Sequence, residues 1–584
     1  MAVAAEERAT IDPFTLEIIK DALVAVGDEM FVSLQRTSKS PIIYEVLDYC
    51  CGILDDQGQL IAQGNGVAGF LGTLTFAVQS VLDKFGRDKL AEGDIIITND
   101  PYSGGGTHLS DVSLVMPIFV DGQLVGFAAN KAHWTEVGGK DPGSWTTDSV
   151  DVFQEGMQFP AVKLFVRGEP IQSLMDLIAA NVRTPDLTMG DVWAQAASVR
   201  LGALRFQEIC AKYGTTRVQE AIRLLLDYGE AMVRRELAAL PAGVYEAEDW
   251  IDDDGLSDEP IYCRVTVTVG PDAFVCDFTG SAPQARGPVN CTRTGLVSAV
   301  RLVFKALTDP HIAANEGTFR PMRVVCPEGT VLTAQRPAPV STYWETMIFA
   351  ADLVWKALAP HVPGRLSAGH FLSVCADVTV TVHPDTNQTT ILVEPNAGGW
   401  GASADQDGEG GLVCVGDGET YILPIEVTET VYGILVDRYA FDVVEGGEGQ
   451  FRGGRGLVRD YRIISDTGGS ITATFGRHKF HPWGVEGGRT GSPNAVQIRF
   501  ADGREPVTVG KTARYPLAKG DMARLITGTG GGWGDPRQRS RDLVQADLRA
   551  ELITEDMARR IYGLGDDDIA GAWGEGPSLR REQL

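Results

Sequence analysis

Two histidines and one aspartate lie close together in a short segment of the chain and could bind a metal ion. The segment spans residues 94–139 and contains His108, Asp111 and His133, although the whole chain of 584 residues has only 8 histidines. Two imidazoles and one carboxylate, with a coordination position left open, suit a catalytic Zn²⁺, Mn²⁺ or Fe²⁺ ion. Two alternatives stay open at this point. The same side chains form the facial triad of non-haem iron oxygenases, and two hydrogen-bonded histidines at a strand end need no metal.

A β-hairpin is expected to bring His133 back to the other two side chains. Two apolar runs, residues 113–120 and 123–132, are separated by an Asp-Gly dipeptide, which is a strong signal for a two-residue turn. This turn pairs the end of the first run with the start of the second and, by extension, position 110 with position 133. His133 therefore lies at the same end of the hairpin as His108 and Asp111.

The alternation of side chains along a strand places a condition on this metal site. In a regular strand, His108 and His133 would point to one face of the sheet and Asp111 to the other. All three side chains can meet only if the backbone around Ser110 bulges or leaves the strand. A metal site therefore predicts an irregular backbone at this point.

The same segment carries a family resemblance. Residues 99–111 read Asn-Asp-Pro-Tyr-Ser-Gly-Gly-Gly-Thr-His-Leu-Ser-Asp, and Asn-Lys-Ala-His follows at 130–133. This pattern resembles the hydantoinase B/5-oxoprolinase family, which includes B-type subunits of ATP-dependent N-methylhydantoinases and caprolactamases and related subunits of acetone and acetophenone carboxylases. The resemblance covers nearly the whole chain. It implies that His108, Asp111 and His133 hold one divalent transition-metal ion, and it disfavours the oxygenase interpretation.

Three carboxylates near the segment are candidate catalytic groups. Family members carry an acidic pair where this chain has Glu45 and Asp48, so the resemblance implies a site role for both. Asp48 could be a fourth metal ligand or a general base, and a solvated turn carboxylate is the alternative. Glu136 is the third candidate proton acceptor. Two departures from the family pattern, Val46 and Phe70, make the site less polar than in many relatives.

The composition excludes some classes of partner. The net charge is −27, with 78 acidic against 51 basic side chains, which argues against nucleic acid and anionic membranes. The 9 cysteines are scattered without paired spacing, as expected in a reducing cytoplasm. We find no uninterrupted apolar run of about 18 residues and no apolar N-terminal leader, so neither a membrane span nor a signal peptide is expected. The expected location is the cytoplasm.

The expected fold class is α+β with several subdomains: a metal-bearing N-terminal α/β region with a helical hairpin, followed by largely β C-terminal regions. An Asp-Pro pair at residues 12–13 precedes apolar residues at spacings of three and four, which predicts an amphipathic helix. Two long helices are predicted at 191–213 and 216–240. The predicted divisions are 12–170 for the metal-site α/β region, 171–240 for the helical segment, 241–395 for a mixed α/β region, 396–538 for a β-rich region, and 539–584 for C-terminal helices and a tail.

No nucleotide-binding loop is visible in the sequence. The glycine-rich stretches 396–411 and 527–536 could cradle a phosphate. They lack, however, the Gly-Lys-Ser/Thr ending that gives a P-loop its lysine and its metal-binding hydroxyl. We expect them instead to let backbones approach closely or to stay flexible.

The resemblance implies one subunit of a hetero-oligomeric, ATP-dependent enzyme. In such systems a hydantoinase A-type partner binds ATP and magnesium and phosphorylates the substrate, or bicarbonate in the carboxylases. The subunit similar to this chain holds a metal ion that acts on the activated intermediate. We therefore expect hydrolysis of a cyclic amide of the hydantoin, lactam or oxoproline type. The alternatives are a subunit of an acetone or acetophenone carboxylase, which acts on a ketone, and a non-catalytic subunit whose metal only fixes the hairpin. Val46 and Phe70 favour an apolar lactam or an aryl ketone over a polar hydantoin.

Overall fold

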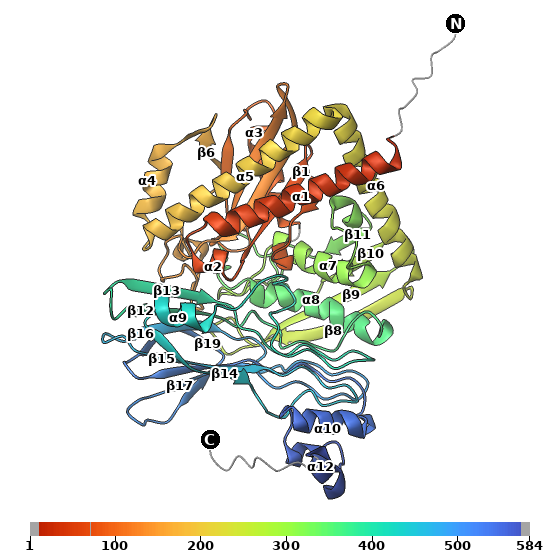
Figure 1. Ribbon diagram of the computed structural model, residues 1–584, viewed down its shortest axis with the longest axis vertical. Helices are drawn as coiled ribbons and strands as arrows, with labels where there is room; N and C mark the ends of the chain where they lie inside the picture. The colour runs from red at the N-terminus through yellow and green to blue at the C-terminus, as the bar shows by residue number, and fades with distance from the viewer. Residues whose placement is uncertain (1–10, 71, 574–584) are drawn as a thin grey trace.

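A seven-stranded antiparallel sheet carries the segment that contains the two histidines. In the computed structural model, which describes residues 11–70 and 72–573, its strand order is β2-β1-β5-β4-β3-β6-β7 (Figure 1). The central strands β4 and β5 form the predicted hairpin, with Val120 opposite Gln123. The strands are β1 (Tyr49–Asp55), β2 (Leu60–Gln63), β3 (Ile95–Thr98), β4 (Asp111–Val120), β5 (Gln123–His133), β6 (Val162–Val166) and β7 (Glu169–Pro170).

Helices cover both faces of this sheet. Helices α1 (Pro13–Thr37) and α5 (Pro185–Tyr213) pack on each other and on the central strands (Figure 1). Helix α3 (Thr73–Phe85) packs on the opposite face. The β4–β5 hairpin is therefore held in a layer between helices. The other helices of this part are α2 (Pro41–Tyr44), α4 (Gln172–Ala180), α6 (Thr215–Ala239) and the 3₁₀ turns η1 (Ala68–Phe70) and η2 (Val152–Gln154).

Helix α1 begins where the sequence predicts it. The side chain of Asp12 accepts a hydrogen bond from the backbone N–H of Thr15 at 3.0 Å, and Pro13 occupies the first helical position. The apolar residues recur every three or four positions and form one buried stripe. The residues of this stripe are Ile19, Leu23, Val26, Met30 and Leu34.

The predicted helical hairpin is present as α5 and α6. Helix α5 begins at Pro185, six residues before the predicted start at 191. Proline is compatible with the first helical turn because its missing N–H has no partner there in any helix. Gly214, with a φ of 86°, separates the two helices. Because α5 lies against β4 and β5, this helical hairpin supports one face of these two strands.

The middle of the chain forms a four-stranded sheet of order β11-β10-β9-β8 with two packed helices. Helix α8 begins at Trp344 and is buried on nearly all sides. It runs through the centre of the molecule, between the first sheet and the C-terminal sheets (Figure 1). The elements are β8 (Gly243–Ile251), β9 (Ile261–Val269), β10 (Phe274–Asp277), α7 (Arg293–Thr308), η3 (Glu316–Phe319), β11 (Met322–Val325), α8 (Trp344–Leu358) and η4 (Ala359–His361).

Two further sheets form the C-terminal half, with orders β13-β12-β16-β19 and β14-β15-β20-β17-β18. The first of these joins strands on both sides of residue 395, so the predicted division there does not separate two sheets. A helix, α9, also interrupts the region predicted to be rich in strands. The elements are β12 (Ala376–Val382), β13 (Thr389–Glu394), α9 (Ile425–Val431), β14 (Ile434–Phe441), β15 (Leu457–Ile463), β16 (Gly469–Thr474), β17 (Ala495–Arg499), β18 (Val507–Val509), β19 (Lys511–Leu517), β20 (Met522–Ile526) and η5 (Pro536–Gln538).

The glycine-rich stretches pack backbone against backbone. A Cβ atom added to Gly530 would lie 2.0 Å from the carbonyl oxygen of Trp400, and one on Gly453 would lie 2.0 Å from the oxygen of Gly530. Only glycine fits at such separations. The backbone N–H of Gly530 donates to Gly454 O at 3.1 Å, and that of Gly454 to Trp400 O at 2.8 Å. The expectation of close backbone approach is therefore confirmed.

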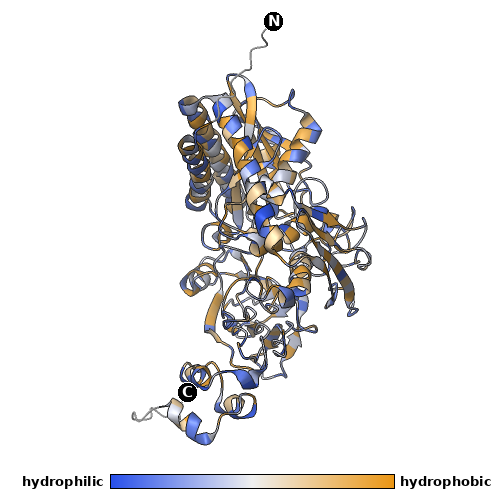
Figure 2. Cartoon of the chain, turned by 90° about the vertical axis from the view of Figure 1, so that its right-hand side faces the viewer, coloured by the Kyte–Doolittle hydropathy of each residue, from blue (hydrophilic) through white to orange (hydrophobic). Residues whose placement is uncertain are grey.

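One continuous hydrophobic core extends from Ile19 to Trp533. The C-terminal helices α10 (Arg541–Arg549), α11 (Glu555–Arg560) and α12 (Asp566–Ala572) have a small core of their own. Figure 1 shows them at the end of the molecule farthest from the seven-stranded sheet, and Figure 2 shows the same end from the side. Within the described ranges, no helix has the length and apolar character required to cross a bilayer.

Candidate metal site

A β-bulge in the hairpin changes which face of the sheet Asp111 shares with the histidines. Val125 of β5 has no opposite residue in β4, so the register shifts by one between Ile118 and Phe119. The shift places Asp111, rather than Ser110, directly opposite His133. Directly opposite residues share one face of a sheet. The carboxylate and the imidazole therefore lie on the same side.

His108 reaches the same point because the chain leaves the strand before Asp111. Residues 107–110 form a bend and turn, in which the backbone N–H of Asp111 donates to His108 O at 3.3 Å. The N–H of Trp134 then donates to Ser110 O at 2.8 Å and ties this turn to the end of β5. The predicted irregularity is thus present in both forms, a departure from the strand near Ser110 and a bulge farther along the hairpin.

The three predicted ligands converge and are buried. One ligand atom from each of His108, Asp111 and His133 lies within 4.8 Å of the other two. His108 Nε2 is 3.2 Å from Asp111 Oδ1, and the two imidazole centroids are 5.0 Å apart. Among the described residues, His108 Nδ1, Asp111 Oδ1 and His133 Nδ1 are buried without a hydrogen-bond partner. Buried polar atoms without partners are rare in proteins, so their clustering here fits a bound ion.

The protonation states suit metal binding. Burial and the nearby His108 lower the pKa of His133 to about 4, so its imidazole is neutral at pH 7 and carries a free lone pair. Burial opposes ionisation of Asp111. The neighbouring His108, His133 and Lys131 outweigh this effect and hold the pKa of Asp111 below its usual range. A neutral imidazole at His133 and a carboxylate at Asp111 are the forms that bind divalent transition metals.

Asp111 is oriented by two hydroxyl groups. The Oγ1 of Thr107 and the hydroxyl of Tyr343 both donate to Asp111 Oδ2, the latter at 3.1 Å. The other oxygen, Oδ1, faces His108. Carboxylate ligands of metal ions are commonly held by outer hydrogen bonds of this kind.

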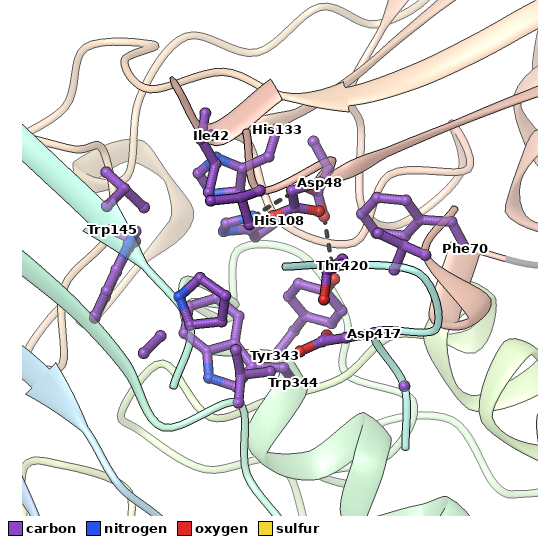
Figure 3. Close-up of a pocket in the computed structure, with 18 of the residues that line it drawn as sticks. Ile42, Asp48, Phe70, His108, His133, Trp145, Tyr343, Trp344, Asp417 and Thr420 are labelled. Atoms are coloured by element: carbon purple, nitrogen blue, oxygen red, sulfur yellow. Dashed lines mark hydrogen bonds and ion pairs between the residues drawn. The ribbon is translucent and has the colours of Figure 1, made fainter. Parts of the chain in front are cut away.

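Asp48 lies beside the three ligands but outside their group. Its backbone oxygen accepts from the N–H of His133 at 3.0 Å, which joins the residue before β1 to the end of β5. Its side chain lines the cavity next to the histidines (Figure 3). Burial, together with the charges of Asp111 and Asp417, raises the pKa of Asp48 well above its usual range. The group of atoms that could hold a metal contains three residues and leaves Asp48 free.

The other two predicted carboxylates do not line the cavity. Glu45 follows the short helix α2 and is half-buried. Glu136 is fully buried, and its carboxylate accepts hydrogen bonds from Arg183 at 2.7 Å, from Gly138 N at 2.9 Å and from Gly143 N at 3.1 Å. This saturated environment favours a structural role for Glu136, which fixes the loop after β5.

The cavity beside the metal ligands has mostly apolar walls. Val46 and Phe70 both line it and contribute to its apolar surface. Phe70 lies in the turn η1 and faces the cavity from the side opposite Trp145 (Figure 3). An apolar cavity with a few polar groups is typical of small-molecule sites. Other apolar lining residues are Ile42, Val67, Met347 and Ile348.

Several site residues come from distant parts of the sequence. Tyr343 and Trp344, at the start of α8, and Asp417 and Thr420, in the loop before α9, line the same cavity. None of them belongs to a motif with metal-ligand or nucleophile spacing. Only the fold brings them to the hairpin, and sequence reasoning therefore missed them.

The chain belongs to the hydantoinase B/oxoprolinase family, whose model matches residues 12–536. This is a family of ATP-dependent amidohydrolases. Caprolactamase subunit beta of Pseudomonas jessenii is 30% identical over 585 residues, which cover 95% of this chain and 96% of that subunit. The uncharacterised protein MJ0963 of Methanocaldococcus jannaschii is 33% identical over 577 residues, covering 98% of this chain and 100% of the relative.

Two solved structures share the fold. The crystal structure of the ATP-dependent caprolactamase from Pseudomonas jessenii superposes with a TM-score of 0.87 at 28% identity, covering 96% of this chain and 97% of that one. A nucleotide-free acetone carboxylase structure gives a TM-score of 0.88 at 17% identity, covering 96% of this chain and 82% of that one. At the lower identity, the second likeness shows the fold alone.

Proposed function

We propose that this chain is the metal-containing subunit of a heteromeric, ATP-dependent enzyme that hydrolyses a cyclic amide. The observation that carries the proposal is the cluster of two imidazoles and one carboxylate, with buried atoms lacking partners, at the wall of an apolar cavity. His108, Asp111 and His133 are the residues that would hold Zn²⁺, Mn²⁺ or Fe²⁺. When bound, such an ion supplies Lewis acidity at this wall.

The geometry favours a catalytic over a structural metal site. A structural site is closed by four protein ligands, whereas a catalytic one has three and leaves a position open. The group here has three, and Asp48 stands beside it with its carboxylate in the cavity. A subunit whose metal only fixes the hairpin would not need this arrangement.

Asp48 is placed to take the proton from an attacking water molecule. Its side chain has no hydrogen bond or ion pair to any of the described residues, so both oxygens are free for this role. In the hydrolysis, the oxygen of water adds to the carbonyl carbon and the ring C–N bond breaks. The ring nitrogen then receives the proton that Asp48 accepted. The apolar walls exclude other water and strengthen these interactions.

We expect ATP to be bound by a second subunit of the enzyme and not by this chain. The caprolactamase relative is itself named as a subunit beta. The glycine-rich stretches of this chain are filled by backbone packing, and neither has the lysine of a P-loop. We expect a hydantoinase A-type partner to supply ATP and magnesium, and phosphorylation of the amide oxygen makes the carbonyl carbon easier to attack. Cleavage of the ring C–N bond then leaves an acyl phosphate, and a second water molecule releases inorganic phosphate from it to give the free carboxylate.

A ketone carboxylase is the second candidate. The fold shared with acetone carboxylase and the apolar cavity both allow it. A Lewis acid can stabilise the enolate of a ketone as well as polarise an amide.

Bicarbonate dependence separates the two reactions. The chain is co-purified with its A-type partner, and ATP turnover is measured with lactams, hydantoins and ketones, with and without bicarbonate. The proposal predicts turnover with a cyclic amide in the absence of bicarbonate. Turnover that requires bicarbonate and a ketone, and ignores every cyclic amide, would show that the chain belongs to a carboxylase.

A further inference from the structure

The cavity has polar atoms without partners on the wall that faces the metal ligands. Among the described residues, Asp417 Oδ2, Thr420 Oγ1 and Trp344 Nε1 are buried and make no hydrogen bond. Trp344 and Thr420 are only 6% and 8% exposed. Figure 3 shows the histidines entering the cavity from the hairpin side and Trp344 and Asp417 from the other side. Buried polar atoms normally have partners, so the clustering of three such atoms on this wall fits a polar ligand.

The loop that carries Asp417 is fixed in position. Backbone N–H groups of Gly69, Glu419 and Tyr421 make hydrogen bonds across the junction between this loop and the N-terminal region, at 2.5 Å to Gly416 O, 3.2 Å to Gly66 O and 2.9 Å to Val46 O. The N–H of Asp417 donates to Cys414 O at 3.0 Å and closes a turn. The carboxylate is therefore held beside the cavity before any ligand arrives, as a recognition group must be.

Gly418 allows this close docking. Its φ is 60°, and a Cβ atom there would lie 2.5 Å from Gly66 O and 2.9 Å from Ala68 N. A larger residue would push the loop away from the turn η1. The docked position of Asp417 thus depends on a specific backbone contact.

Asp417 lacks a compensating cation. No Lys, Arg or His of the described residues forms an ion pair with it, and burial raises the pKa of Asp417 to about 7. A carboxylate in such a place gains most from a ligand that donates a hydrogen bond. The indole N–H of Trp344, in contrast, can only donate.

We propose that Asp417 and Trp344 recognise the polar edge of a ring amide: Asp417 accepts a hydrogen bond from the ring N–H, and Trp344 donates one to the carbonyl oxygen. This inference rests on the proposed function and names its substrate class, a lactam-like ring with an unsubstituted N–H. In a small ring the amide is cis, so the N–H and C=O lie along one edge and can meet one wall of the cavity. A ketone has the oxygen but not the N–H, and an N-alkyl lactam has lost the N–H.

The test compares three small five-membered cyclic carbonyl compounds, of which only one has an N–H. Binding of 2-pyrrolidinone, N-methyl-2-pyrrolidinone and cyclopentanone to the full-length chain is measured by ligand-observed NMR titration. The wild-type chain should bind 2-pyrrolidinone about tenfold or more tightly than the other two. Asp417→Ala should abolish this preference, and Asp417→Asn, which can still accept a hydrogen bond, should retain part of it.

Trp344→Phe and Glu419→Gln complete the set. Trp344→Phe should weaken all three ligands to a similar extent, because each contains the oxygen that Trp344 contacts. Glu419 is in the same loop but does not line the cavity, so Glu419→Gln should behave as wild type. Thermal unfolding of each variant identifies any that fail to fold, in which case Asp417→Asn and Trp344→Phe decide the question.

Two outcomes overturn the inference: a folded Asp417→Ala chain that keeps the full preference, or a wild-type chain that binds none of the three ligands or prefers none of them. The proposed function fails separately, if the complex of the wild-type chain with its partner turns over no cyclic amide. Amide turnover with an unchanged preference in Asp417→Ala would leave the proposed function standing and reject the recognition role.

Discussion

The two carboxylate oxygens of Asp111 have different surroundings, and only one of them is available to bind a metal ion. Oδ2 is held by Thr107 and Tyr343, whereas Oδ1 faces His108 without a hydrogen bond. His108, Asp111 and His133 could be proposed as a group from the sequence, because their residue types, the turn signal and the family resemblance all pointed to them. Tyr343 could not, because it lies 232 residues from Asp111 and only the fold brings it there.

The variant Asp48→Asn tests whether Asp48 is a proton acceptor, as proposed, or a metal ligand. We expect the variant to keep its metal, because the three-residue group does not include Asp48. Turnover of a cyclic amide by the complex should fall by about 10²–10⁴-fold, the usual contribution of a general base. Steady-state kinetics and elemental analysis of the same preparation check both parts. Loss of the metal together with the activity would instead make Asp48 a ligand.

Among the secondary-structure elements, the β4–β5 hairpin was predicted from the sequence pattern, but its bulge was not. The Asp-Gly turn and its two apolar runs predicted β4 and β5 correctly, and the alternation rule correctly demanded an irregular backbone. The bulge at Val125 was not predicted, because Val125 is an apolar residue in an apolar run and fits either register. The loop of Asp417 was missed for a different reason: its position is set by backbone hydrogen bonds to residues more than 300 positions away.

Gly418→Ala tests whether the docked loop matters. The added Cβ would clash with Gly66 O and the positive φ disfavours alanine, so we expect a loss of about 1–3 kcal/mol in local stability. Lactam binding should weaken while metal content stays at the wild-type level. The matched control is Gly364→Ala, where a Cβ meets nothing within 4 Å. Equal lactam affinity in both variants would show that the loop position is not needed.

For the molecule as a whole, the α+β class with several sheets was predicted, but the way the sheets join was not. The sheet β13-β12-β16-β19 crosses the division expected near residue 395, because glycine turns are poor markers of domain ends in a chain rich in glycine. One core then connects the first sheet to the last, with α8 buried between them. This continuity lets residues from three regions line one cavity.

The isolated chain should not bind ATP. Its glycine-rich stretches are occupied by their own backbone contacts, and neither carries a P-loop lysine. Isothermal titration calorimetry of the isolated chain with ATP and magnesium should therefore give no heat above that of dilution. The complex with the A-type partner should give a clear heat of binding. Tight binding by the chain alone would mean that one of the glycine-rich stretches is a nucleotide site.

The most direct test of the central claim is the metal content of the purified chain. Elemental analysis of the wild-type protein should find about one transition-metal ion per chain, because two imidazoles and one carboxylate form one site. His108→Ala and His133→Ala should each lose it, while Glu136→Gln, altered outside the cavity, should retain it. Full metal occupancy in both histidine variants would contradict the assignment of the site.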